Sequence, residues 1–275
     1  MEDLHKSNKF SAFFNDKTKV VYSLYIRIDD ANFDDSGPVP GEPNVLKPKR
    51  TQEKMDYYYD QLIADKKRYA ESIGAEFIMF ERDKMYEDFL KKYSNMSEYD
   101  TINLYKIFLL EKLADKYDLV LYLDFDVYCR RDIDIFNTIN CTNFLRCEFT
   151  TKNYLGINNT IEYFSNYNKD FRDPQSKYWN THALLDEYEL NVSETKVFNT
   201  GIIAASSNMI KSLDFFGNLE DILKVMTKLK EDEDSMYLPQ IQKAFGYDNE
   251  TIFAFKTVIN NVKINLLLLP NLCII

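Results

Sequence analysis

The spacing of apolar residues predicts strands and helices that alternate along the first half of the chain. Residues 19–28 and 76–80 are rich in β-branched and aromatic side chains and are predicted as strands. Residues 51–73 and 101–117 have helical periodicity. Thr51 is expected to cap the first helix, and Asp100 or Thr101 the second. The run LVLYL at 119–123 is apolar without alternation, as expected of a central parallel strand covered on both faces.

The later half reads as a mixture of strands and helices. The predicted elements are strands at 143–149 and 197–205, helices within 207–229 and 235–245, and a buried strand followed by a chain end at 264–275. Between the first strand and the first helix, a loop is predicted at about 29–50, because this stretch holds four of the seven prolines. No internal repeat or dividing linker is visible. We therefore expect a single α/β domain over 1–275, with a mostly parallel central sheet flanked by helices.

Composition narrows the class of partner. The chain has 275 residues, of which 45% are hydrophobic and 15% aromatic, so it is not expected to be disordered. Asp and Glu number 44 against 34 Lys and Arg, which gives a formal charge of −10 and argues against nucleic acid as a partner. With only 7 glycines, no glycine-rich phosphate-binding loop can be assembled.

Nothing in the sequence predicts membrane insertion or a structural zinc site. The N-terminal residues are polar and charged, unlike a secretory signal, and the apolar stretch 264–275 is short and interrupted by Asn265, Pro270 and Asn271. The four cysteines form no CxxC pair, and His5 and His182 are the only histidines. A cytoplasmic protein without a disulfide framework or transmembrane segment is the simplest interpretation.

The candidate chemistry lies where the strand at 119–123 ends in Asp124-Phe125-Asp126. In open α/β sheets, ligands bind beyond the carboxyl ends of the strands, and the i, i+2 spacing puts both carboxylates on one side of an extended backbone. Two such charges about 4 Å apart repel by roughly 4 kcal/mol at an effective dielectric near 20. A Mn²⁺ or Mg²⁺ ion would remove that repulsion. The alternative is that one aspartate caps a turn and the other is solvated.

Three blocks of sequence resemble the GT-A glycosyltransferases. A helix carrying Lys106 leads into residues 117–127, YDLVLYLDFDV, which resemble the family's apolar strand ending in DxD. Residues 196–204, KVFNTGIIA, resemble its FN[TA]G strand, and residues 231–234, EDED, resemble an acidic D[QE] segment that opens a helix. The likeness is to the glycogenin-like and galactosyl- or xylosyltransferase-like retaining branches, and it covers about residues 19–270.

This resemblance implies transfer of a hexosyl or pentosyl group from a nucleotide sugar, UDP-linked in the closest branches. The acceptor would be a hydroxyl of a glycan, a protein or a small molecule, and the anomeric configuration would be retained. Asp124 and Asp126 would hold Mn²⁺ or Mg²⁺ against the diphosphate, and Lys106 would lie near the donor phosphate or sugar. An ordinary solvated helix lysine is the alternative interpretation of Lys106.

The same resemblance assigns the remaining candidates. Ser23 and Tyr25 end the first strand, where the family holds the nucleoside, although packing alone would also explain Tyr25. Asn199, Thr200 and Gly201 would lie under the transferred sugar, and Asp234 would be the carboxylate near the anomeric carbon or a sugar hydroxyl, with Asn199 and Asp234 as the catalytic candidates. Acidic residues at a helix start are also favoured by the helix dipole, without any catalytic role.

One departure from the family pattern keeps other functions open. Retaining members supply a third metal ligand from a histidine near the C-terminus, and no histidine follows His182 here. A non-catalytic sugar- or protein-binding module on a decayed transferase scaffold is therefore one alternative. Another is a haloacid-dehalogenase-like phosphohydrolase with Asp124 as nucleophile and Asp126 as acid/base. The Val127-Tyr128 that follows does not match that family's small residue and threonine.

Overall fold

The computed structural model describes the chain in two compact units. The described residues are 18–29, 32–33, 38–39, 42–138, 145–149, 175–190, 192, 197–242 and 245–266. The first unit holds those up to Arg146 together with Gly201–Lys211, and the second holds those of Cys147–Thr200 and Ser212–Leu267. Because each unit combines segments distant in sequence, neither is formed by one continuous stretch of chain. The single domain expected from sequence stays a prediction.

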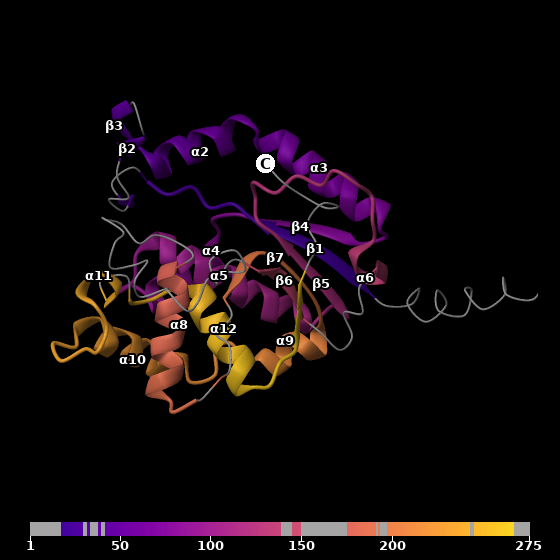
Figure 1. Cartoon of the computed structure of the whole chain (residues 1–275). Helices are drawn as coiled ribbons and strands as arrows, with labels where there is room; N and C mark the ends of the chain where they lie inside the picture. Colours follow the sequence, from indigo (N-terminus) through magenta and orange to yellow (C-terminus); the bar gives the residue numbers. More distant parts are fainter. Residues whose placement is uncertain are drawn as a thin grey trace, which may run out of the picture. The chain divides into compact units, whose positions relative to one another are not determined.

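The first unit is built on a mostly parallel sheet (Figure 1). In the strand order β4-β1-β5-β7, strands β4 (Glu76–Phe80), β1 (Lys19–Leu24) and β5 (Leu119–Leu123) are parallel, and β7 (Phe198–Ser206) runs antiparallel to β5. β6 (Leu145–Phe149) follows β7 in that order. In register, Val21 of β1 lies opposite Phe77 on one side and Leu121 on the other. The α/β class and the mostly parallel sheet are thus confirmed, and β4 and β5 have the predicted bounds.

Helices cover both faces of this sheet. The helices of the unit are α2 (Lys47–Tyr57), α3 (Tyr59–Ser72), α4 (Lys84–Lys92), α5 (Glu98–Ala114), α6 (Ile135–Thr138) and α9 (Ser207–Leu213). α3 packs on β1 and β4, and α5 packs on β5; Figure 1 shows α3 above the sheet and α5 below it. Every residue of β5 is buried, as the unbroken apolar run predicts. Residues 38–46, inside the predicted loop, contribute the antiparallel strands β2 (Pro38–Val39) and β3 (Glu42–Leu46).

The predicted helix starts are wrong by three or four residues. α2 begins at Lys47, so Thr51 is not its cap; Pro48 stands in its first turn, where a missing N–H costs no helical hydrogen bond. α5 begins at Glu98 because Ser97 is the cap, its Oγ accepting from the backbone N–H of Asp100 at 3.0 Å. α4 was not predicted. The predicted helix at 51–73 is interrupted at Tyr58, between α2 and α3.

The end of α3 depends on the backbone conformation of Gly74. Its φ is +66°, its N–H donates to the carbonyl of Glu71 at 3.2 Å, and the next N–H, of Ala75, donates to Ala70 at 2.9 Å. This is the Schellman pattern that satisfies the last carbonyls of a helix. A Cβ at Gly74 would meet no atom within 4 Å, so the cost of substitution is conformational.

We expect Gly74→Ala to lower the free energy of unfolding by about 1 kcal/mol, because alanine disfavours the left-handed region. Gly74→Asn is the matched control, since asparagine tolerates this conformation and should cost less. Urea denaturation of the variants measures both. Equal stability of Gly74→Ala and the parent protein would contradict the expectation.

The second unit is mostly helical. Its elements are α8 (Gln175–Glu187), α10 (Leu219–Glu231), α11 (Pro239–Gln242), α12 (Asn249–Ile259) and β8 (Ile264–Leu266). α8 packs against α10, α11 and α12. A buried cluster holds this packing together and consists of Tyr178, Trp179, Ala183, Val197, Ile241 and Phe245.

The elements predicted from sequence agree less well with the structure in this unit than in the first. α8 and α12 were not predicted, and the predicted helix at 235–245 is reduced to the four residues of α11. Of the predicted strand at 264–275, β8 forms the first three residues, and the remainder lies outside the described residues. Within the described ranges, no helix combines the length and apolarity needed to cross a bilayer.

Candidate metal and substrate site

The Asp124–Asp126 pair lies directly after the buried strand β5, as predicted. The N–H of Asp124 donates to the carbonyl of Gly201 in β7 at 2.7 Å, and a turn closes where the N–H of Val127 donates to Asp124 O at 3.1 Å. The last residue of β5, Leu123, accepts the Ser23 hydroxyl at 2.7 Å. The backbone of the pair is therefore fixed from β1 and β7, the two strands that neighbour β5.

Asp124 lies beside a buried lysine and a buried tyrosine. Its Oδ1 accepts the Tyr122 hydroxyl at 2.5 Å and lies 3.7 Å from Nζ of Lys106. Lys106 is only 5% exposed, and its ammonium also lies 5.5 Å from the centre of the Tyr122 ring. Burial, followed by the charge of Asp124, raises the pKa of Tyr122 well above its ordinary value, so this hydroxyl stays a hydrogen-bond donor. Because Lys106 is buried, the interpretation of an ordinary solvated lysine is wrong; its predicted place near the donor phosphate or sugar stays a prediction.

Asp126 is exposed to solvent, and its carboxylate is repelled by that of Asp124. Partial loss of hydration, followed by repulsion from Asp124, raises the pKa of Asp126, while Lys66 and Lys106 act in the opposite direction. Two nearby carboxylates whose charges are incompletely neutralised are suited to a divalent cation.

The donor set fits one type of cation site. Among the described residues, no cluster of three or more His, Cys, Asp or Glu could enclose a metal ion. From the described residues, a cation here would have the carboxylates of Asp124 and Asp126, beside water and substrate oxygens. Mg²⁺ is commonly bound in this way, through one or two carboxylates plus phosphates.

Tyr25 belongs to an aromatic cluster next to this pair. Its ring stacks on Phe125 with centroids 4.6 Å apart and planes 13° apart, and Tyr59 of α3 lies 5.4 Å from the same Phe125. The Tyr25 hydroxyl donates to Asp56 at 2.6 Å. The turn at Phe125 is thus packed against the end of β1 and the start of α3. Ser23, by contrast, is completely buried.

Sequence reasoning missed the part that α3 plays in holding this segment. Lys66 donates to the carbonyls of Phe125 and Val127 at 2.6 and 2.7 Å, and Asp65 accepts the N–H of Cys129 at 2.6 Å. Both side chains are buried. The available signal was a charged Asp-Lys dipeptide on the otherwise apolar face that Leu62 and Tyr69 mark within the predicted helix.

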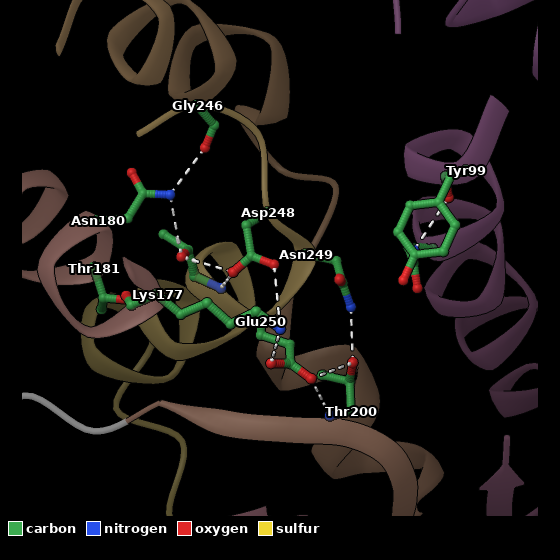
Figure 2. Close-up of polar contacts among 11 residues, drawn as sticks. Tyr99, Lys177, Asn180, Thr181, Thr200, Gly246, Asp248, Asn249 and Glu250 are labelled. Carbon is green, nitrogen blue, oxygen red and sulfur yellow. Dashed lines mark hydrogen bonds and ion pairs between the residues drawn. The ribbon is translucent and has the colours of Figure 1, made fainter. Parts of the chain in front are cut away.

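Thr200 belongs to a polar cluster of the second unit, drawn in Figure 2. Its N–H donates to Oε1 of Glu250 at 2.9 Å, and its hydroxyl accepts from the amide of Asn249 at 2.7 Å. The other oxygen of Glu250 accepts from Lys177 at 2.6 Å. Burial raises the pKa of Glu250, and the charge of Lys177 opposes that rise. Asn199, which precedes Thr200, is half-buried.

The same cluster organises the start of α12. Asp248 caps the helix by accepting from the N–H and the hydroxyl of Thr251, each at 2.8 Å. Asn180 of α8 donates to the carbonyl of Gly246 at 2.9 Å and to Thr251 Oγ1 at 3.3 Å (Figure 2). None of these residues was a candidate from sequence, because neither α8 nor α12 was predicted.

Asp234 lies elsewhere in the second unit, at the surface. The acidic run follows the C-terminal end of α10, and Asp234 sits in a turn where its N–H donates to Asp232 at 3.1 Å. The expectation that this run opens a helix is therefore wrong, and the dipole explanation does not apply, because a helix C-terminus disfavours negative charge. His182 pairs with Asp186 at 2.9 Å, also within this unit.

Of the nine site residues predicted from sequence, six lie in the first unit and three in the second. The six, joined by the contacts given above, are Ser23, Tyr25, Lys106, Asp124, Asp126 and Gly201. The three are Asn199, Thr200 and Asp234.

Comparison with known proteins gives no family assignment. No family model matches the sequence, and no curated protein matches it. Among solved structures, the chain is similar to a glycosyltransferase involved in the glycosylation of the major capsid of PBCV-1. The two are 11% identical over 91% of this chain and 82% of that one, with a TM-score of 0.39. A likeness this distant carries no statement about the chemistry of the present chain.

Proposed function

We propose that this protein is a metal-dependent glycosyltransferase that moves a hexosyl or pentosyl group from a UDP-linked sugar to a hydroxyl acceptor, with retention of configuration. The observation that carries the proposal is the Asp124–Asp126 pair at the carboxyl end of buried β5, with Lys106 beside it. Ligands of open α/β sheets bind at this edge. The two sequence blocks that resemble the DxD strand and the FN[TA]G strand of GT-A enzymes support the same chemistry.

The reaction needs stabilisation of negative charge on the departing nucleoside diphosphate. Mn²⁺ or Mg²⁺ held by Asp124 and Asp126 would act there as a Lewis acid. The buried ammonium of Lys106 contributes a second positive charge in surroundings that water screens poorly. Tyr122, by donating to Oδ1, fixes the orientation of the Asp124 carboxylate.

The other substrate contacts remain part of the proposal. Tyr25 would take the nucleoside base beside its stacked partner Phe125, and buried Ser23 would shape the pocket through Leu123 rather than through a free hydroxyl. By the sequence resemblance alone, Gly201 would lie near the transferred sugar, and Asn199, Thr200 and Asp234 stay candidates whose roles rest on the sequence. The acceptor is a glycan, protein or small-molecule hydroxyl.

A donor screen tests this function. The protein is mixed with UDP-glucose, UDP-galactose, UDP-GlcNAc, UDP-xylose or GDP-mannose in the presence of Mn²⁺, and release of the nucleoside diphosphate is measured. We expect hydrolysis of at least one UDP-sugar, its loss on chelation with EDTA, and a rise in Tm with UDP plus Mn²⁺.

The other outcomes of that screen point to the alternatives. No turnover of any donor, together with no thermal shift, would favour a non-catalytic binding module. Release of phosphate from a generic phosphomonoester, abolished by Asp124→Asn, would instead indicate a phosphohydrolase.

A further inference from the structure

One face of α3 hydrogen-bonds the backbone of segment 124–134, which joins β5 to α6. Lys66 binds the carbonyls of Phe125 and Val127, and Asp65 accepts the N–H of Cys129. Arg68 donates to the carbonyl of Cys129 at 2.7 Å and to Asp65 at 3.0 Å. Three of the four helix positions 65–68 therefore supply side chains that bond both ends of the stretch 125–129.

Lys66 makes the hydrogen bonds of this arrangement that lie closest to Asp126. It is completely buried, and its ammonium donates to the carbonyls of Phe125 and Val127, the residues before and after Asp126. The same ammonium lies 5.3 Å from the centre of the Phe125 ring. Because both carbonyls bind one nitrogen, the Phe125–Asp126 and Val127–Tyr128 peptide groups are tied to each other, which restrains the backbone between them at Asp126. The other backbone bonds of the turn are its own 3.1 Å bond from Val127 N–H to Asp124 O and the 2.7 Å bond from Asp124 N–H to Gly201 O, and neither of them involves the backbone of Asp126.

The energetics favour a specific role over simple packing. A buried ammonium is costly to desolvate and is retained where hydrogen bonds compensate it. An apolar side chain at this position would avoid that cost but would leave two buried carbonyls without their donor. The cost of burying the ammonium is therefore consistent with a need to keep the backbone around Asp126 in one conformation.

We propose that Lys66 is a positioning residue that fixes the Asp124–Asp126 turn for cation and diphosphate binding. The proposal rests on the proposed function of that pair. Lys66 is not assigned any contact with substrate: it acts through the two backbone carbonyls. Residues that orient metal ligands in this way are commonly worth about 10- to 100-fold in metal affinity.

The test compares Lys66→Met with Lys67→Met, the neighbouring exposed lysine on the same helix. Two quantities are measured: amide hydrogen exchange over residues 125–129 without ligand, and the Kd of Mn²⁺-dependent UDP binding by calorimetry. We expect Lys66→Met to accelerate exchange and to weaken binding by about tenfold or more, and Lys67→Met to change neither. Lys66→Arg, which keeps a charged donor, should restore part of the affinity.

A purely structural role would predict a lower Tm but unchanged Mn²⁺–UDP affinity in the folded protein, and that result would overturn the proposal. Tyr69→Phe is the comparison for stability, because it removes the 3.0 Å bond to Ile133 O, which is more distant from Asp126, and should leave Kd unchanged. If Lys66→Met does not fold, Lys66→Gln takes its place with the same criterion. Absence of UDP binding by the parent protein would refute the proposed function instead, whereas unchanged exchange in the Lys66 variant would refute the positioning role.

Discussion

Asp126→Asn is expected to abolish Mn²⁺-dependent UDP binding and to lower kcat/KM for the UDP-sugar by about 100-fold or more, while the fold stays intact. A metal bound as a Lewis acid contributes several kcal/mol of charge stabilisation in the transition state. The substitution keeps the shape of the side chain and removes its charge. Because Asp126 is exposed, its replacement should have little effect on the free energy of unfolding.

Calorimetric titration of UDP at fixed Mn²⁺ and steady-state kinetics measure this effect. Asp88→Asn is the matched control: it removes a carboxylate from the exposed surface of α4, where Asp88 pairs with Lys91 at 3.7 Å. Its activity should equal that of the parent protein. Undiminished UDP binding by folded Asp126→Asn would show that the aspartate pair is not the metal site.

The sequence predicted best those elements that local composition determines. β5 is an unbroken apolar run ended by Asp124. β4 is Glu76 followed by four apolar residues, and the charged residues Glu81 and Arg82 come directly after it, so both strands had clear limits. The aspartate pair was found because its signal, two carboxylates after such a strand, is also local. Lys106 was named as a candidate from the resemblance to a family rather than from the pattern, and its contact with Asp124 was not predicted.

What could not be predicted depends on contacts between distant segments. The bonds from Lys66 to Phe125 and Val127 join residues about sixty positions apart, and no local pattern specifies them. α12 carries aromatic and β-branched residues that give no clear amphipathic period, and nearly all its positions are buried. Packing in the second unit therefore decides its helical state more than propensity does. The acidic run 231–234 was predicted to open a helix but lies at the C-terminal end of α10, and here too the local pattern did not identify the helix to which it belongs.

Glu250→Leu is expected to lower the free energy of unfolding of the second unit by about 3 kcal/mol or more, the range for removing one partner of a buried ion pair. The substitution would leave the N–H of Thr200 and the ammonium of Lys177 without the acceptor that both use. Asp248, 3.8 Å from Lys177, compensates only part of that charge. Urea denaturation followed by fluorescence reports this unit directly, because Trp179 is the chain's single tryptophan and lies in its core.

Two further variants separate the ion pair from simple loss of packing. Glu233→Leu, at an exposed position of the same unit, should change stability by less than about 0.5 kcal/mol. The double variant Lys177→Met with Glu250→Leu should recover part of the loss, because it removes the unpaired charge as well. If the double variant is no more stable than Glu250→Leu alone, the cost lies in the backbone of Thr200 rather than in the buried ammonium. A fully stable Glu250→Leu would contradict the structural role of the pair, since losing this buried carboxylate removes an acceptor that both Lys177 and Thr200 use.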